Sequence, residues 1–525
     1  MQKIGGTRRV TRVLGVGFLA GVVALGLGSM PSSAQDVAGS AATPTTPTTP
    51  DAPAAPAEAA PAAVVGDTTP QASIQATGTP FGAGYPVTLE SNFSRPYRAV
   101  TNSRDGDFSL LDDLERLIRG SYRDPRTGKY LPRATRRANT VYISISQMPD
   151  SKRVGRELIR AAKADVKVRV IHGRATQSSA SRSLQRALKK KSLRDAGFKI
   201  CAKGKSLACL SSLNGAIMHS KVLLINNTFT RDNKPARGVV WSGSANLGGR
   251  SAEQTYNNGM TIYNDRKLWQ ESLQLWNDMY AERNIGNDYL NYVKKNRVKY
   301  GLENNEARAL GYTEGNARYG MFYSNLANVT IYPTPIKATP TNGKDPVVNL
   351  LNRVIPDDQC RIRLQHNRFK YRRIGVAEKL VELSNGGCKI SAVAYEDNLK
   401  VNRKLHCQSL IRICRPILDV LKTSSQRIDV AYAKPHDKTM LVDAKLKKNL
   451  LNPEEVAPDG STSANWPAEG VRMKVVQAGS ASLTGSNLVV SDEITTETTD
   501  PTMYEDYLEH WKAILKSHEY KRYPY

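Results

Sequence analysis

The stretches HSKVLLIN at residues 219–226 and HDKTMLVD at residues 436–443 decide the fold of this chain. Each is His-x-Lys, then four mostly apolar residues, then Asn or Asp. A second repeated motif follows each stretch, GSANL at residues 243–247 and GSASL at residues 479–483. Because the 525 residues contain only seven histidines, two in the same local frame indicate an internal duplication. The repeat predicts one site assembled from two halves of the chain.

The segments around the two motifs follow the same order of strand and helix patterns. Runs of β-branched residues predict strands, and apolar residues three and four positions apart predict helices. The predicted strand–helix–strand units are 140–145, 152–163 and 166–171 in the first half, and 360–364, 372–383 and 389–394 in the second. This order implies right-handed crossovers. We therefore expect an α/β fold with largely parallel or mixed sheets covered by helices.

The first eighty residues differ in composition from the rest of the chain. Four basic residues precede the apolar run at 13–27, and small residues follow it, so residues 1–34 predict an export signal of bacterial type. Residues 35–80 are mostly Ala, Pro and Thr and predict a disordered spacer. We place a first folded half at residues 81–322 and a second at 323–525. The export signal predicts a secreted, extracellular protein.

The net charge of +27 lies entirely on the folded part, because residues 1–80 hold four basic and four acidic side chains. A surface this basic attracts phosphate-rich partners, whether anionic membranes or nucleic acid. General solubility of a secreted protein is the alternative explanation. The charge therefore supports a phosphate-bearing partner without choosing among them.

The six cysteines predict up to three disulfides in an oxidising compartment. Fifteen connectivities are open in principle for six cysteines. Proximity in sequence favours Cys201–Cys209 and Cys407–Cys414, which leaves Cys360–Cys388. No group of Cys and His has the spacing of a zinc site, so we predict no metal.

Each His-x-Lys motif places two groups suited to phosphodiester chemistry on one face. Side chains alternate along a strand, so the His and the Lys point the same way. An imidazole can attack or protonate, and an ammonium can hold phosphate oxygens. Asn226 and Asp443 lie at odd spacing from the His, so they are better placed to brace neighbouring backbone. The Gly-Ser-Ala stretches add candidate phosphate-binding side chains, namely Ser244, Asn246, Ser480 and Ser482.

In these features the chain resembles the phospholipase D superfamily, whose signature is a duplicated His-x-Lys-x4-Asp motif followed by Gly-Ser-x-Asn. The resemblance covers nearly all of residues 86–525 in arrangement and is specific for the superfamily but not for the substrate. It implies two α/β-sandwich halves related by a pseudo-twofold axis, with the active site at their interface. The reaction it implies is metal-independent and needs no cofactor.

The resemblance also implies roles for the motif residues. One His attacks phosphorus to form a phosphohistidine, and the other protonates the leaving alcohol and then activates water or an acceptor alcohol. By analogy with secreted bacterial members, His219 is the nucleophile and His436 the acid/base. Lys221 and Lys438 stabilise the charge on the phosphoryl oxygens.

Three positions depart from the family pattern. Asn226 replaces an Asp, and Ser482 replaces an Asn for which Asn487 could compensate. The acidic residue that follows each Gly by fourteen positions is Glu493 in the second half but Asn257 in the first. In the family this residue orients a His across the interface, so the departure predicts one imidazole that is less well poised.

The leading interpretation is a secreted, monomeric phospholipase D-type enzyme of lipid catabolism. It would hydrolyse phospholipid headgroups, or transfer them, at an anionic membrane surface. One alternative is a secreted nuclease of the same superfamily. The other is a lipid- or phosphate-binding protein with a weakened site. A polar insertion at residues 445–467 makes the second motif segment nineteen residues longer than the first. We expect this insertion to act as a lid over the site.

Overall fold

The structure is a computed structural model. It describes residues 81–96, 106–148, 152–173, 177–193, 195–201, 205–282, 322–336, 345–395, 413–450, 452, 454–517 and 521–522. All of these belong to one compact unit of the chain. The predicted export signal, the predicted spacer and Cys407 lie outside the described residues. Among the described helices, none is both long enough and apolar enough to span a membrane.

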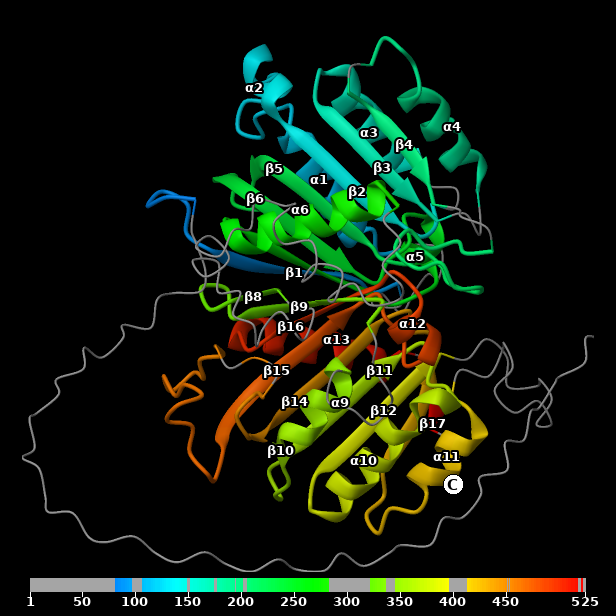
Figure 1. Ribbon diagram of the computed structural model, residues 1–525, viewed down its shortest axis with the longest axis vertical. Coiled ribbons are helices and arrows are strands. Elements are labelled where there is room, and N and C mark those ends of the chain that lie inside the picture. Colours follow the sequence, from blue (N-terminus) through cyan, green and yellow to red (C-terminus); the bar gives the residue numbers. More distant parts are fainter. Residues whose placement is uncertain are drawn as a thin grey trace, which may run out of the picture. The chain divides into compact units, whose positions relative to one another are not determined.

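The first motif belongs to a seven-stranded mixed sheet with the order β1-β7-β6-β5-β2-β3-β4 (Figure 1). The elements of this part of the chain are β1 Thr88–Ser94, α1 Ser109–Gly120, α2 Arg133–Ala138, β2 Thr140–Ile145, α3 Lys152–Lys163, β3 Lys167–His172, α4 Ser179–Leu188, β4 Gly197–Ile200, β5 Val222–Phe229, β6 Pro235–Gly243, α5 Gly249–Glu253, β7 Asn257–Tyr263 and α6 Arg266–Tyr280.

The second motif belongs to a ten-stranded sheet with the order β17-β13-β12-β11-β14-β15-β16-β9-β8, and β10 also pairs with β14. Its elements are β8 Phe322–Ser324, β9 Val329–Pro333, α9 Pro346–Arg353, β10 Val354–Ile355, β11 Arg361–His366, the 3₁₀ helix η3 Tyr371–Arg373, α10 Ile374–Asn385, β12 Lys389–Tyr395, α11 Arg415–Leu421, β13 Asp429–Ala433, β14 Lys438–Leu446, β15 Val471–Gly479, α12 Gly485–Val489, β16 Ile494–Thr498, α13 Pro501–Leu515 and β17 Lys521–Arg522.

The two sheets repeat one strand order, β1-β7-β6-β5-β2-β3-β4 in the first and β9-β16-β15-β14-β11-β12-β13 in the second. In both, the strand that follows the motif is flanked by an antiparallel hairpin partner and by the first strand of a parallel pair. The predicted α/β class and the predicted strand–helix–strand units are confirmed, with boundaries shifted by one or two residues. The division at residue 322 remains a prediction, although β8 does begin the second sheet there.

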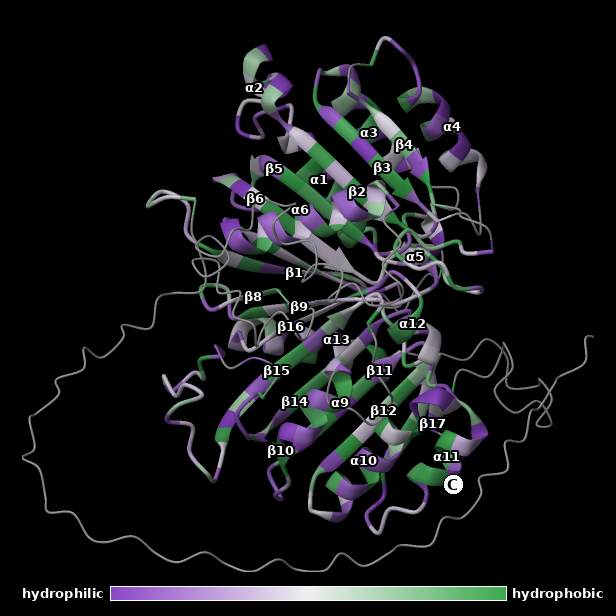
Figure 2. Ribbon diagram, viewed as in Figure 1, coloured by the Kyte–Doolittle hydropathy of each residue, from purple (hydrophilic) through white to green (hydrophobic). Residues whose placement is uncertain are grey.

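Helices cover both faces of each sheet. In the first sheet, α1, α3 and α4 pack on one face and α6 on the other. In the second, α9, α10 and α11 pack on one face and α13 on the other. Apolar residues accordingly run along the central strands of both sheets (Figure 2). Strands buried on both faces this way hold the motif segments rigidly at the strand ends.

Two of the helices on the second sheet begin at the same Asp-Pro signal. Asp345 caps α9 with Pro346 in the first turn, and Asp500 caps α13 with Pro501 in the first turn. The carboxylate accepts backbone N–H groups that have no partner inside the helix, and Pro lacks an N–H to leave unpaired. These starts set where α13 crosses the sheet, which matters for the site described below.

The insertion at 445–467 is not a lid, and this expectation was wrong. It joins β14 to β15, which are antiparallel with Thr439 opposite Ala478 and Leu446 opposite Val471. The motif residue Lys438 therefore lies at the open end of the hairpin and the insertion at the other end. Eight residues of strand at about 3.3 Å each separate them by about 26 Å. An insertion in a hairpin loop lengthens the molecule at the end opposite to the motif.

Two of the three predicted disulfides lie within the described residues, and both are formed. Cys201 bonds to Cys209 and Cys360 bonds to Cys388. The second one ties the start of β11 to the start of β12, the first parallel pair of the second sheet. Disulfides of this kind are typical of an oxidising compartment.

Candidate active site

Each motif histidine is held by backbone from the other half of the chain. The His219 N–H donates to the Asp492 carbonyl at 2.9 Å, and the Asp492 N–H donates to the Ile217 carbonyl at 3.0 Å. In the same way, the His436 N–H donates to the Tyr256 carbonyl at 2.8 Å. Both histidines lie just before the strands that were expected to carry them, since β5 begins at Val222 and β14 at Lys438. The two motifs are thus joined at the strand ends.

The imidazoles are oriented by the residues that follow those backbone partners. His219 Nδ1 lies 2.7 Å and 2.9 Å from the two carboxylate oxygens of Glu493. His436 Nδ1 lies 3.0 Å from Asn257 Oδ1. The Asn257 amide nitrogen donates to the carbonyls of Ser251 and Thr255, both at 2.9 Å. The amide oxygen therefore faces the ring, where it can accept a proton from His436 Nδ1. Lys438 Nζ also lies 3.3 Å from this ring nitrogen.

The two lysines are buried beside the histidines. Lys221 is 0% exposed and Lys438 is 2% exposed. Each ammonium donates to the carbonyl of the histidine two residues before it, at 2.5 Å for Lys221. Burial lowers the pKa of Lys221 to about 8. Burial, and then repulsion by Lys221, holds the pKa of Lys438 well below its ordinary value. An anion between the two ammonium groups would relieve this repulsion, so the site favours a negatively charged ligand.

The pKa values of the other ionisable groups of the site are also shifted so that the neutral form is favoured. Burial, followed by the charges of Lys221 and Lys438, holds the pKa of both imidazoles well below the usual range. Burial raises the pKa of Glu493 to about 7, although both lysines oppose the shift. Every group that could bind or move a proton here is thus displaced toward its neutral form. Shifts of this kind cluster at functional sites.

The serines of the Gly-Ser-Ala stretches brace the loop backbone. Ser244 Oγ accepts the Asn258 N–H at 3.0 Å, and Ser480 Oγ accepts the Ile494 N–H at 3.0 Å. Ser480 also hydrogen-bonds the Glu493 carboxylate. These hydroxyls therefore support the residues that orient the imidazoles, and their expected binding of phosphate stays a prediction.

The remaining residues of those stretches differ in their surroundings. Ser482 donates to Asn367 Oδ1 at 2.6 Å. Asn487, the residue that could compensate for Ser482, donates to Glu493. Asn246 Oδ1 is buried and has no hydrogen-bond partner among the described residues. Of this group, Asn246 retains an acceptor that a ligand could use.

Two predicted site residues, Asn226 and Asp443, lie away from the histidines. Asn226 Oδ1 accepts the Thr140 N–H at 2.7 Å, and its amide donates to the Ala138 carbonyl at 2.9 Å. Five residues of strand separate it from Lys221, about 16 Å. Asp443 pairs with Arg472 at 2.9 Å. Both brace backbone or a neighbouring strand, as their odd spacing predicted, and any role for them in phosphate binding or orientation stays a prediction.

Sequence reasoning missed a cation next to the site. Arg368 follows β11, and its charge lowers the pKa values of His219 and Lys438. Its carbonyl accepts the Leu483 N–H at 3.1 Å, as the Gln147 carbonyl accepts the Leu247 N–H at 3.2 Å in the first half. Equivalent backbone positions thus carry a cation on one side and an amide on the other. The signal was present, since both residues follow the first strand of a predicted parallel pair.

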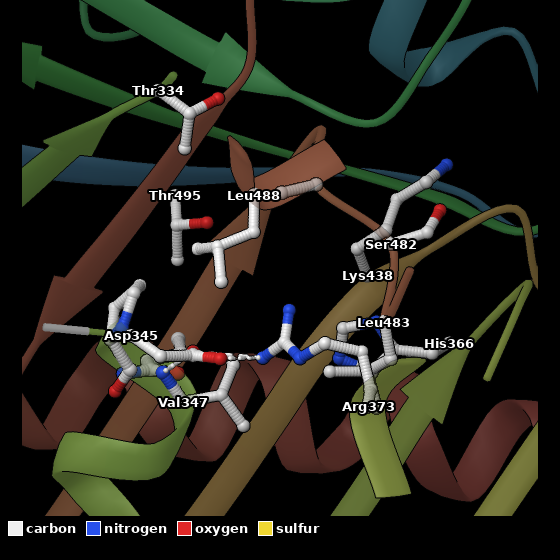
Figure 3. A pocket seen from close by; sticks show the side chains of 13 residues that line it. Thr334, Asp345, Val347, His366, Arg373, Lys438, Ser482, Leu483, Leu488 and Thr495 are labelled. Atoms are coloured by element: carbon white, nitrogen blue, oxygen red, sulfur yellow. Dashed lines mark hydrogen bonds and ion pairs between the residues drawn. The ribbon is translucent and has the colours of Figure 1, made fainter. Parts of the chain in front are cut away.

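A small cavity beside Lys438 and Ser482 is lined by both polar and apolar side chains (Figure 3). Its water-accessible volume is about 20 Å³, which is room for one water molecule. An ion pair between Arg373 and Asp345, with a separation of 2.6 Å, forms part of its wall. His366 also lines it, and burial, then repulsion by Arg373 and Lys438, lowers its pKa to about 3. The His366 imidazole is therefore neutral and adjoins a motif lysine, although this histidine has no His-x-Lys motif around it.

Residues 131–279 match a family model described as "Cardiolipin synthase, PLD-like domain". No curated protein matches the chain. Among the described residues, no group of three or more Asp, Glu, His or Cys side chains could hold a metal ion.

Three of the solved structures that match the chain are the following. Phosphatidylserine synthase from Haemophilus influenzae is 11% identical with a TM-score of 0.48, over 86% of this chain and 90% of that one. Polyphosphate kinase from Porphyromonas gingivalis is 12% identical with a TM-score of 0.44, over 83% of this chain. This chain spans about half, 48%, of that kinase. The phospholipase D family member Nuc from Salmonella typhimurium is 13% identical with a TM-score of 0.25, over 38% of this chain and 99% of that one.

The buried pair beside the cavity gives a stability prediction. Arg373→Ala should lower the free energy of unfolding by about 3–5 kcal/mol, because it leaves the fully buried Asp345 carboxylate without its counter-charge. Lys512→Ala, which removes the exposed pair with Glu509, should cost less than about 1 kcal/mol. Urea unfolding of both variants measures the difference. Equal midpoints for the two variants would contradict the prediction.

Proposed function

We propose that this chain, whose residues 131–279 belong to the phospholipase D-like family, is a phosphodiesterase that works through a phosphohistidine. One observation carries the proposal. The imidazoles of His219 and His436 are each held at Nδ1 by a residue of the other half, beside the buried Lys221 and Lys438. Two imidazoles held at Nδ1 and two ammonium groups are what an in-line double displacement at phosphorus requires.

His219 is the proposed nucleophile. Its Nε2 attacks phosphorus and forms a P–N bond while the bond from phosphorus to the alcohol oxygen breaks. A phosphorylated imidazole that keeps its Nδ1 proton is positively charged, and the Glu493 carboxylate 2.7 Å away can balance that charge. Asn257 offers no such charge to His436, so the paired carboxylate favours His219 for this role.

His436 is the proposed acid and base. The bound phosphate anion favours its protonated form, and its Nε2–H then gives a proton to the leaving alcohol oxygen. In the second step His436 takes a proton from water, whose oxygen bonds to phosphorus as the P–N bond breaks. An acceptor alcohol in place of water would give headgroup transfer. Lys221 and Lys438 stabilise the phosphoryl oxygens in both steps.

The proposed substrate is a phospholipid, cleaved at its headgroup. The description of the matching family as a cardiolipin synthase domain supports a lipid. The charge of +27 supports an anionic membrane surface as the partner, and it supports nucleic acid equally well, so a nuclease is the second candidate. We further propose that the protein is secreted and monomeric, and the two disulfides support an oxidising compartment.

A weakened, non-catalytic site is less well supported. Two of the departures from the family pattern, Asn226 and Ser482, have structural partners away from the imidazoles. The third, Asn257, still contacts His436 at Nδ1. None of the three removes a group that the proposed reaction uses.

The proposal predicts which variants lose turnover. In EDTA, His219→Ala and His436→Ala should each reduce headgroup release from phosphatidylcholine vesicles at least about 1,000-fold, because each removes a reacting group. Asn226→Asp restores the family residue at a position about 16 Å along the strand from Lys221. This variant should keep the wild-type rate within about twofold. Single- and double-stranded DNA are tested in parallel with the same four proteins.

Each outcome of this assay has one meaning. Histidine-dependent cleavage of DNA without lipid turnover would make the chain a nuclease. Loss of activity on chelation would contradict the metal-independent reaction. No turnover of any diester would leave a binding protein.

The shifted pKa values predict a narrow pH optimum. Below about pH 7 Glu493 takes up a proton and loses the charge that balances phosphorylated His219. Above about pH 8 Lys221 loses the charge that binds phosphate. The value of kcat/KM should therefore be highest between these limits, and Glu493→Gln should remove the acidic limb. A profile that is flat from pH 6 to 9 would contradict these assignments.

A further inference from the structure

The middle residue of the second motif, Asp437, is a buried carboxylate on the face opposite to His436 and Lys438. It is 0% exposed. Asn258 donates to its Oδ1 at 2.7 Å, and Gln365 donates to its Oδ2 at 2.7 Å. His510 Nε2 lies 2.9 Å from the same Oδ2. A buried carboxylate is tolerated only when its oxygens are hydrogen-bonded like this, so the contacts fix Asp437 in one orientation.

The tautomer of His510 follows from its second contact. Arg95 Nε lies 3.1 Å from His510 Nδ1. A guanidinium only donates hydrogen bonds, so Nδ1 must accept and Nε2 must carry the proton that is donated to Asp437. The His510 ring is stacked on Phe93, with 4.4 Å between ring centres. Arg95, His510 and Asp437 thus form a chain of two hydrogen bonds. Arg95, just after β1, donates to His510 on α13, and His510 donates to Asp437 in the second motif.

Consecutive residues of β7 hold consecutive residues of the second motif from both faces. Asn257 holds the His436 ring on the front, and Asn258 holds Asp437 on the back. Within the part of the chain that the structure describes, the first motif has no buried carboxylate on its back face. Its middle residue is Ser220, which pairs with Ser144 Oγ at 3.1 Å, and the residue after Glu493 is the apolar Ile494.

We propose that His510 and Asp437 are positioning residues for the second motif. The hydrogen bond between them fixes the backbone at Asp437. His436 and Lys438, the neighbours of Asp437 in the chain, therefore point into the site in one orientation. This inference rests on the proposed function, because it assigns the residues to the reaction in which His436 moves the proton. Groups held this way matter for rate, since a misplacement of about 1 Å can cost about 100-fold.

The test compares two substitutions of His510. The side-chain amide of Gln can take the place of the ring Nε2, and the shorter amide of Asn can take only the place of Nδ1. In His510→Gln the amide N–H can occupy the position of Nε2–H and donate to Asp437, whereas the shorter side chain of His510→Asn cannot reach. His510→Asn should lower kcat about 10- to 100-fold with KM unchanged within twofold, and His510→Gln should recover it to within about threefold of wild type. Both variants remove the same stacked ring, so a loss of stability alone would affect them equally.

A second measurement does not depend on turnover. With histidine labelled by ¹⁵N in the full chain, His510→Asn should shift the ring signals of His436 and leave those of His219 unchanged. If His510→Asn does not fold, Arg95→Met at its half-buried position removes the donor to Nδ1 together with the cation–π contact to Phe93. It should lower kcat about threefold to tenfold and shift the same His436 signals.

Equal activity of the Gln and Asn variants, or equal shifts at His219 and His436, would overturn the inference. No turnover by the wild-type protein would overturn the proposed function, and the ring signals would then still decide whether His510 positions His436.

Discussion

The whole site depends on one constraint, which is that each motif histidine is held, at its backbone N–H and at its ring Nδ1, by residues of the other half of the chain. Asp492 and Glu493 hold His219, and Tyr256 and Asn257 hold His436. The Asp492 carboxylate is itself buried and accepts the backbone N–H groups of Cys209 and Leu210 at 2.5 Å and 3.1 Å. The Cys201–Cys209 disulfide, the second sheet and the first motif are therefore one connected structure.

The two sides of this structure are alike in backbone and different in charge. Glu493 faces one imidazole where Asn257 faces the other, and Arg368 occupies the position of Gln147. A duplication supplies two equivalent frames, but a reaction with distinct attacking and proton-moving groups needs them to differ. The charged Glu493 at Nδ1 of His219 and the neutral Asn257 at Nδ1 of His436 make the two histidines chemically different.

Much of the architecture was predictable because it follows from local patterns. The periods of apolar residues located the strands around both motifs, and the odd spacing of Asn226 and Asp443 from the histidines predicted their bracing role. The position of the 445–467 insertion was also open to deduction, since a loop between antiparallel strands lies at the end away from the motif. The lid expectation failed because it ignored that geometry.

The chain of hydrogen bonds from Arg95 through His510 to Asp437 could not be predicted in this way. Asp437 meets a side chain 73 residues further along the chain, and Arg95 lies 415 residues from its partner. No local period relates such positions, and a lone histidine in a helix gives no signal of its partner. The water-sized cavity with Asp345 and Arg373 was missed for the same reason.

The most direct test of the central claim is a measurement of the ring N–H protons of His219 and His436 in ¹⁵N-histidine-labelled protein. The account predicts two hydrogen-bonded Nδ1–H signals, one lost in Glu493→Ala and the other in Asn257→Ala. Each substitution should leave the second signal in place. Signals that survive both substitutions would show that the other half of the chain does not hold the histidines, and the proposed site would then be wrong.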